Sequence, residues 1–241
     1  MLKKETIDLL NNEEKNFQNV FSICVGKSFT IQKRLKDYLG SFSNWDTDVR
    51  EGILKLDERP FKVEYIGTTS TSDNFWYSAE EESVIPEEYS RLINRTRTYI
   101  ESLNVYPLLA QSKIVLGGDV NGYNLSMIYV AFAPENVGFY SAQGSTTINM
   151  YIKDLPEDVF KPITTYDEIV NMIVQTLKTF TVNHKLMVKA LLCENGIMYN
   201  EVNNDAKDEI IASIDNGESI SIKFDNMGRV KNIIRNFKKE E

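Results

Sequence analysis

The chain has 241 residues, of which 42% are hydrophobic and 26% charged, and 35 acidic against 27 basic side chains give a formal net charge of −8. This length and apolar content supply an ordinary core, which excludes a disordered chain. The net negative charge argues against electrostatic binding of nucleic acid or anionic lipid over a large surface. Apolar runs are short and no signal-peptide core follows the start, so we expect a cytoplasmic protein without a membrane partner.

The first segment has the pattern of a helix. Apolar residues at spacings of three, four and seven predict a long amphipathic helix from Ile7 to Tyr38, ended by Gly40, with Gly26 as the point where it can break. After Gly40 the period changes to two. Segments 52–56, 61–66 and 74–77 are separated by turn residues and predict an antiparallel meander.

The middle of the chain alternates between helix and strand signals. Pro86, followed by two glutamates, predicts the start of a second helix that ends near residue 104. A short strand is expected at 113–116. Residues 123–132 fit a buried helix or a strand, because almost every position is apolar or small, and we favour helix. Residues 138–142 and 146–152 predict a hairpin.

The last third begins with a capping-box pattern at Thr165 and Glu168, which predicts one helix running to Asn195. A short helix near residues 205–214 and a final hairpin built from 219–224 and a strand from Arg229 complete the prediction.

These elements predict an α+β fold, with an antiparallel sheet (a meander plus C-terminal hairpins) and helices mainly on one face. We expect two parts. Residues 1–160 form the core domain with the long N-terminal helix, and residues 161–241 form a C-terminal helix and β-hairpin packed on that core rather than independent of it.

No motif in the sequence predicts a catalytic centre. Gly26-Lys27-Ser28 imitates the end of a phosphate-binding loop, but Phe21 stands where that loop needs its first glycine. His184 is the only histidine, which excludes a metal centre with two imidazoles in one chain. We therefore expect no catalytic residue, no metal and no cofactor, and structural roles for His184 and for both cysteines, Cys24 and Cys193.

Several segments between residues 40 and 155 resemble a bacterial family known only as a domain of unknown function. The segments that carry the resemblance are 61–68, Asn74-Phe75-Trp76-Tyr77-Ser78-Ala79, Ile85-Pro86 and Gly138-Phe139-Tyr140-Ser141. The resemblance implies a Trp-rich strand block, a helix that starts at Ile-Pro and an aromatic hairpin, but no activity. The order of elements is also similar to that of secretion-chaperone-like proteins, in which helices cover one sheet face and a groove binds a protein partner.

Our leading hypothesis is a non-catalytic protein-binding module, of the kind found among immunity, chaperone-like or phage counter-defence factors. Tryptophan and tyrosine on an incompletely covered sheet are enriched in binding hot spots. Strand alternation places half of such residues in the core. The candidate partner-binding aromatics are Trp76, Tyr77, Phe139 and Tyr140.

Two alternatives remain open. The first is a small-ligand-binding protein or enzyme with an anion pocket between the sheet and the helix after Pro86, where Arg95, Arg97 or Tyr140 would contact the anion. The second is an acidic nucleic-acid mimic that presents residues 80–88 to a basic partner. In all of these hypotheses except the small-ligand one the partner is a protein, and we do not expect nucleic acid as a partner.

Overall fold

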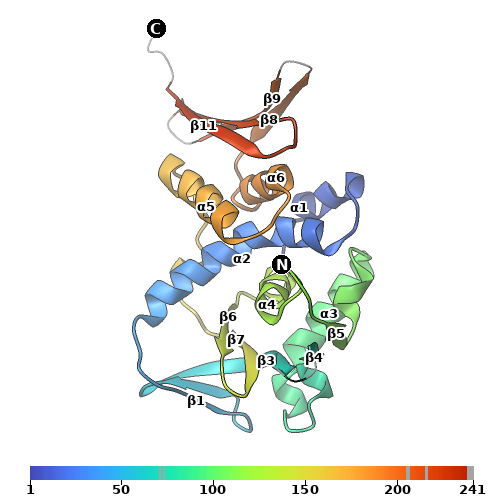
Figure 1. Ribbon diagram of the computed structural model, residues 1–241. Helices are drawn as coiled ribbons and strands as arrows, with labels where there is room; N and C mark the ends of the chain where they lie inside the picture. Colours follow the sequence, from blue (N-terminus) through green and yellow to red (C-terminus); the bar gives the residue numbers. More distant parts are fainter. Residues whose placement is uncertain (71, 73, 205–206, 215–216, 238–241) are drawn as a thin grey trace.

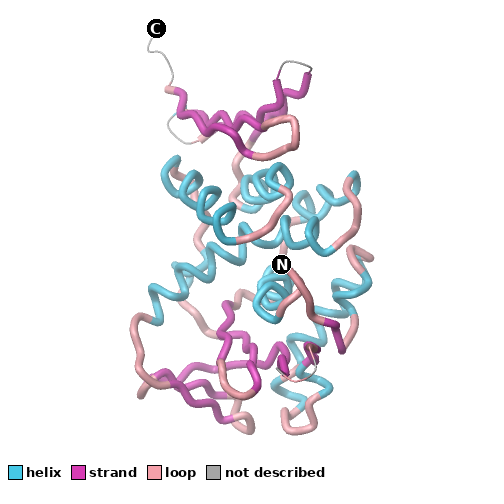
Figure 2. Tube along the Cα trace, viewed as in Figure 1, coloured by secondary structure: helices cyan, strands magenta, loops and turns pink. Residues whose placement is uncertain are grey.

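The protein folds into two antiparallel sheets separated by helices, as seen in a computed structural model (Figures 1 and 2). The structure describes residues 1–70, 72, 74–204, 207–214 and 217–237. A long helix, α2 (Phe17–Leu39), crosses the middle of the molecule, with a seven-stranded sheet on one side and a four-stranded C-terminal sheet on the other. This arrangement confirms the predicted α+β class with antiparallel sheets.

The described helices and strands follow one another along the chain with short connections. The helices are α1 (Lys4–Asp8), α2 (Phe17–Leu39), α3 (Arg91–Leu103), α4 (Gly122–Phe132), α5 (Tyr166–Thr179) and α6 (His184–Glu194). The strands are β1 (Trp45–Asp48), β2 (Ile53–Leu56), β3 (Arg59–Ser70), β4 (Phe75–Ser78), β5 (Lys113–Val115), β6 (Gly138–Ala142), β7 (Thr146–Ile152), β8 (Tyr199–Asn204), β9 (Lys207–Ser213), β10 (Ser219–Phe224) and β11 (Val230–Asn236).

Strand β3 is the centre of the larger sheet. It pairs with β2 near its start, with β4 near its end and with β7 along most of its length, and β6 lies beyond β7. The predicted meander and the hairpin of β6 and β7 are therefore confirmed. The register shifts next to Gly67, where a Cβ would lie 2.3 Å from the Tyr77 carbonyl oxygen. Only glycine fits at this bulge without moving the neighbouring strand.

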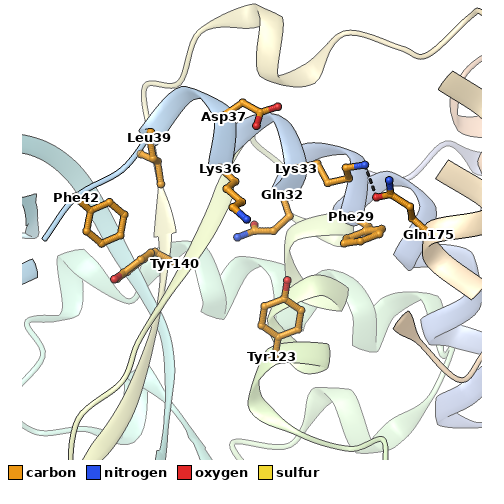
Figure 3. A pocket seen from close by; sticks show the side chains of 11 residues that line it. Phe29, Gln32, Lys33, Lys36, Asp37, Leu39, Phe42, Tyr123, Tyr140 and Gln175 are labelled. Atoms are coloured by element: carbon orange, nitrogen blue, oxygen red, sulfur yellow. Dashed lines mark hydrogen bonds between the residues drawn. The ribbon is translucent and has the colours of Figure 1, made fainter. Parts of the chain in front are cut away.

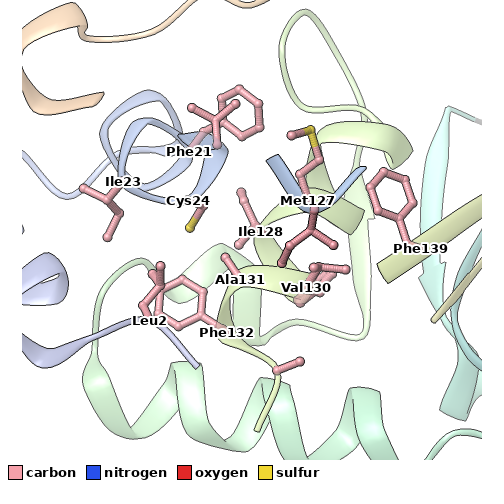
Figure 4. Close-up of a cluster of buried hydrophobic side chains, with 14 of the residues drawn as sticks. Leu2, Phe21, Ile23, Cys24, Met127, Ile128, Val130, Ala131, Phe132 and Phe139 are labelled. Atoms are coloured by element: carbon pink, nitrogen blue, oxygen red, sulfur yellow. The ribbon is translucent and has the colours of Figure 1, made fainter. Parts of the chain in front are cut away.

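The main core lies between α2, α4 and the larger sheet. Helix α4, for which we favoured helix over strand, is buried over nearly its whole length. The Ser28 hydroxyl of α2 donates to the Met127 carbonyl at 2.6 Å, which fixes the close approach of the two helices. Figure 4 shows the apolar side chains that face one another here. Helices α3 and α4 cover the same face of the sheet. The Trp76 ring of β4 stacks on Tyr129 of α4, and the Glu64 carboxylate of β3 accepts the Leu92 amide hydrogen at the start of α3.

The N-terminal helix breaks earlier than expected. The break lies before α2 at residues 13–16, where the Asn16 side chain accepts from the Asn19 amide at 2.9 Å and caps a new helix. Helix α2 then runs unbroken through Gly26. A Cβ on Gly26 would approach Leu191 of α6 to 3.1 Å, so this glycine serves helix packing rather than a break. Gly40 ends the helix as predicted, with φ of +68°.

The second and third predicted helices also differ from the structure. Helix α3 begins at Arg91 and not at Pro86, because a short 3-10 turn, Glu87–Tyr89, intervenes. The single helix predicted from Thr165 is two helices. The Thr165–Glu168 capping box starts α5 as predicted, but the chain leaves the helix at Phe180 and Asn183 caps α6 by accepting from the Leu186 amide. The break lets both helices pack on α2.

The C-terminal sheet replaces a predicted helix. Residues 207–213 form strand β9, whose Ile210 and Ala212 are buried with the period of two that a half-covered strand requires. Residues 205 and 206 of that predicted helix lie outside the described residues. Strand β8 was not predicted, whereas the hairpin of β10 and β11 was. The division of the chain at residue 160 remains a prediction.

Candidate functional site

Two of the four candidate aromatics belong to the core. Trp76 and Phe139 are 0% exposed. The Trp76 ring stacks on Tyr129 with 5.3 Å between centroids, and the Phe139 ring lies 5.0 Å from Tyr123. Neither can touch a partner while the protein is folded, so their assignment as partner-binding residues was wrong. The expectation that alternation buries half of the candidates is confirmed.

The other two aromatics, Tyr77 and Tyr140, are partly exposed but do not share one site. They lie on β4 and β6, with β3 and β7 between them, which separates their backbones by roughly 14 Å at the usual strand spacing. The Lys113 ammonium lies 5.0 Å from the Tyr77 ring centroid. Tyr140 instead faces Phe42, with 6.0 Å between ring centroids.

The two candidate arginines do not form the expected anion pocket with Tyr140. Arg95 donates to Glu135 at 2.7 Å. Arg97, a residue of α3, is partly buried, pairs with Glu80 and donates to the Ala110 carbonyl. Both guanidinium groups therefore already pair with a carboxylate of the chain, although the buried Nε of Arg97 has no hydrogen-bond partner among the described residues. Glu80 is also the first residue of the acidic segment 80–88, so part of that segment has an internal partner.

The structure does place Tyr140 in a cleft of about 630 Å³, which we call the α2–β6 cleft (Figure 3). Its walls come from α2, the N-terminal end of α4, strand β6 and helix α5. The lining residues are Phe29, Gln32, Lys33, Lys36, Asp37, Leu39, Gly40, Phe42, Tyr123, Tyr140 and Gln175.

Local structure explains how α2 supplies one wall. Phe29, Gln32, Lys33 and Lys36 recur at spacings of three and four, which places them along one side of the helix. At the end of the helix Arg59 donates to the Leu39 carbonyl at 2.7 Å, satisfying one of the carbonyls that the last turn leaves without a partner.

Positive charge gathers on the α2 wall. The Lys33 ammonium donates to the Gln175 side chain, and Lys36 points into the cleft (Figure 3). In the described part of the chain neither ammonium has a carboxylate within ion-pair distance. Asp37 also lines the cleft, but Figure 3 shows its carboxylate directed away from Tyr123 and Tyr140. The accessible charges beside the rings are therefore the two lysines.

The polar groups opposite the lysines are two tyrosine hydroxyls and the side-chain amide of Gln32. Burial raises the pKa values of Tyr123 and Tyr140, so both hydroxyls stay protonated at neutral pH. Gln32 donates through Nε2 to the Phe139 carbonyl at 3.0 Å. Its Oε1 is buried and has no hydrogen-bond partner among the described residues. Such an orphaned acceptor is costly unless a bound group supplies a donor.

The titratable side chains in the lining are two lysines, two tyrosines and one aspartate. Asp37 is the only carboxylate of the lining, which contains no histidine or cysteine. Cys24 is buried, burial raises the pKa of the Cys193 thiol, and His184 accepts the Val230 amide hydrogen through Nδ1 at 3.1 Å. Among the described residues, His, Cys, Asp and Glu side chains nowhere gather in threes as a metal ion would require.

Sequence reasoning found only one residue of this cleft, Tyr140. A signal for the α2 wall exists in the spacing of Phe29, Gln32, Lys33 and Lys36, but the same spacing describes an ordinary solvent-facing helix side. Tyr123 reaches the cleft only because α4 packs beneath α2, which no local pattern reveals.

Comparison with known proteins gives one result. Residues 18–155 match DUF6882, a family of unknown function, over more than half of the chain. The chain belongs to this family. The family segment of this DUF6882 member runs from α2 to just beyond β7 and supplies every lining residue of the cleft except Gln175. No curated protein and no solved structure matches the chain. In the described residues, no helix combines the length and apolar character needed to cross a bilayer.

Proposed function

We propose that the protein is a non-catalytic protein-binding module whose partner docks in the α2–β6 cleft. One observation carries the proposal. The cleft gathers the rings of Phe29, Phe42, Tyr123 and Tyr140 beside two lysines that lack carboxylate partners in the described chain, although the whole chain has a net charge of −8. Aromatic side chains, tyrosine among them, are enriched among the residues that dominate binding energy in protein interfaces, and nearby lysines add charge complementarity to an acidic partner.

The class of immunity, chaperone-like or phage counter-defence factors is consistent with such a module. We further propose that it acts in the cytoplasm. Both cysteines are free thiols, which accords with a reducing compartment.

Site-specific photocrosslinking tests the proposal in the organism that encodes the protein. A p-benzoylphenylalanine at position 123 should give a discrete covalent adduct with another protein, because Tyr123 lines the cleft and is 39% exposed. The matched control is position 38, since Tyr38 is 40% exposed but does not line the cleft. The control should give no such adduct.

Charge reversal then asks whether the adduct depends on the cleft. The double variant Lys33→Glu/Lys36→Glu should lose the adduct at position 123. The variant Lys55→Glu/Lys231→Glu changes the net charge equally at two exposed positions outside the cleft, and it should keep the adduct. No adduct at position 123, or one that both double variants retain equally, contradicts the proposal.

A further inference from the structure

Strand β6, which forms one wall of the cleft, is an edge strand. It pairs with β7 alone among the described strands. An edge strand presents one row of backbone N–H and C=O groups that no neighbouring strand satisfies.

The contact with Gln32 tells which backbone groups of β6 face that free edge. The Phe139 carbonyl accepts from Gln32 on α2, so it is directed away from β7. In an antiparallel pair the backbone groups of every second residue point the same way. The N–H and C=O of Ser141 therefore also point to the free edge, and neither has a hydrogen-bond partner elsewhere in the described chain.

Other groups complete a surface that fits an extended chain. The Oε1 of Gln32 is a buried acceptor beside the same edge, and it lacks an N–H to bind. The side chains flanking the edge alternate, with Phe139 and Tyr123 on one side and Tyr140 and Phe42 on the other. Alternate side chains of an added strand would meet Tyr123 on the first side, where Phe139 itself is fully buried, and Tyr140 and Phe42 on the other.

We propose that the partner enters the cleft as an extended, acidic segment that adds to β6 as a further strand. The segment's backbone bonds Ser141, its apolar side chains contact the tyrosines, and a carboxylate lies beside Lys33 and Lys36. Main-chain hydrogen bonds of this kind provide affinity, and side-chain pockets provide specificity. This inference rests on the proposed function, because it describes how a partner occupies the same cleft.

The first experiment selects binders from a phage-displayed library of random linear peptides on the full-length protein. We expect enriched peptides to alternate apolar residues and to carry at least one Asp or Glu. Their affinity should fall at least tenfold on the Lys33→Glu/Lys36→Glu variant and stay unchanged on Lys55→Glu/Lys231→Glu. N-methylation of the selected peptide at every second residue should abolish binding in one register and leave it intact in the other.

The second experiment changes the strand edge itself. Ser141→Pro removes the N–H that faces the free edge, a change that edge strands tolerate. Ser141→Ala is the matched control, because it removes only the hydroxyl, which donates to Asn149 at 2.6 Å. We expect peptide affinity to fall at least tenfold in the proline variant and less than threefold in the alanine variant. If the proline variant does not fold, the N-methyl series decides alone.

The outcomes separate this inference from the proposed function. Peptides that need the lysines but bind equally well whichever backbone positions are N-methylated overturn strand addition and leave a protein-binding cleft in place. A library that yields no binder sensitive to Lys33→Glu/Lys36→Glu overturns the inference, and the crosslink from position 123 then shows whether the proposed function stands. If neither a lysine-dependent peptide nor a crosslink from position 123 is found, both proposals are overturned.

Discussion

Alternation along β4 predicts that Trp76 and Tyr77 play different roles, and the structure resolves which is which. Trp76 is fully buried against Tyr129, so we expect Trp76→Ala to lower the free energy of unfolding by about 3–5 kcal/mol through lost burial and the cavity it leaves. Urea unfolding followed by circular dichroism measures this change.

The other tryptophan supplies the control for this prediction. Trp45 lies on edge strand β1 and is 37% exposed, so Trp45→Ala should change the unfolding free energy by less than about 1 kcal/mol. Equal effects of the two substitutions would contradict the burial assignment. The sequence predicts that side chains of β4 alternate between two faces. It does not show which face is buried, because β4 has aromatic residues on both faces.

At the scale of elements, the late start of α3 has its cause in a distant residue. Glu64 of β3 is buried. Its carboxylate accepts the Leu92 amide hydrogen at 2.8 Å and a hydrogen bond from the Lys153 ammonium at 2.6 Å. The sheet therefore supplies the cap that the helix sequence lacks. Pro86 is a local helix-start signal, and no local pattern could show that a strand residue fixes the true start.

Removing this cap should loosen the first turn of α3. We expect Glu64→Ala to reduce stability by about 1.5–3 kcal/mol, the range for hydrogen bonds to a charged group. Glu64→Gln keeps an acceptor for the Leu92 amide and should have a smaller effect. Hydrogen exchange at the first amides of α3 provides the direct measurement. Unchanged exchange there in the alanine variant would contradict the capping role.

His184 links α6 to strand β11 and makes this contact sensitive to pH. Burial, and then the nearby Arg229 charge, lower the pKa of His184 below its ordinary value of 6.5, with Asp225 opposing the shift. The neutral imidazole accepts the Val230 amide hydrogen, and the protonated form cannot do so through Nδ1. A depressed pKa means that this stabilisation is complete above pH 6.5 and is lost as the pH falls below it.

The expected loss is about 1 kcal/mol, the usual contribution of one hydrogen bond. Unfolding free energies of the wild type should fall more between pH 7.5 and pH 5 than those of His184→Asn, whose side-chain oxygen can accept at nearly the same place without titrating. Parallel pH profiles of the two proteins would show that the Val230 contact does not depend on the charge of His184.

At the scale of the whole molecule, the sequence predicted the parts that depend on local chemistry. The hairpin of β6 and β7, the capping box at Thr165 and the stop at Gly40 follow from turn residues and periodicity. The breaks before α2 and between α5 and α6 have local caps, Asn16 and Asn183, which the apolar periodicity concealed, whereas the cleft depends on how helices cross. Gly26 illustrates the difference, because its sequence context indicates a break and its place against Leu191 requires close packing.

The C-terminal part packs directly on α2, although the family segment ends at residue 155. The Phe180 ring packs 5.4 Å from Phe21 and 5.2 Å from Phe29, and the Asn183 amide donates to the Ser22 hydroxyl at 2.8 Å. Truncation after residue 160 uncovers this side of α2, so the fragment 1–160 should lose its cooperative thermal transition and its near-UV circular dichroism signal. Co-expression with fragment 161–241 should restore both, since the two pieces then bury the same surface. A fragment 1–160 that melts cooperatively by itself would show that α2 needs no cover from α5 and α6, and that the family segment folds within an independent domain.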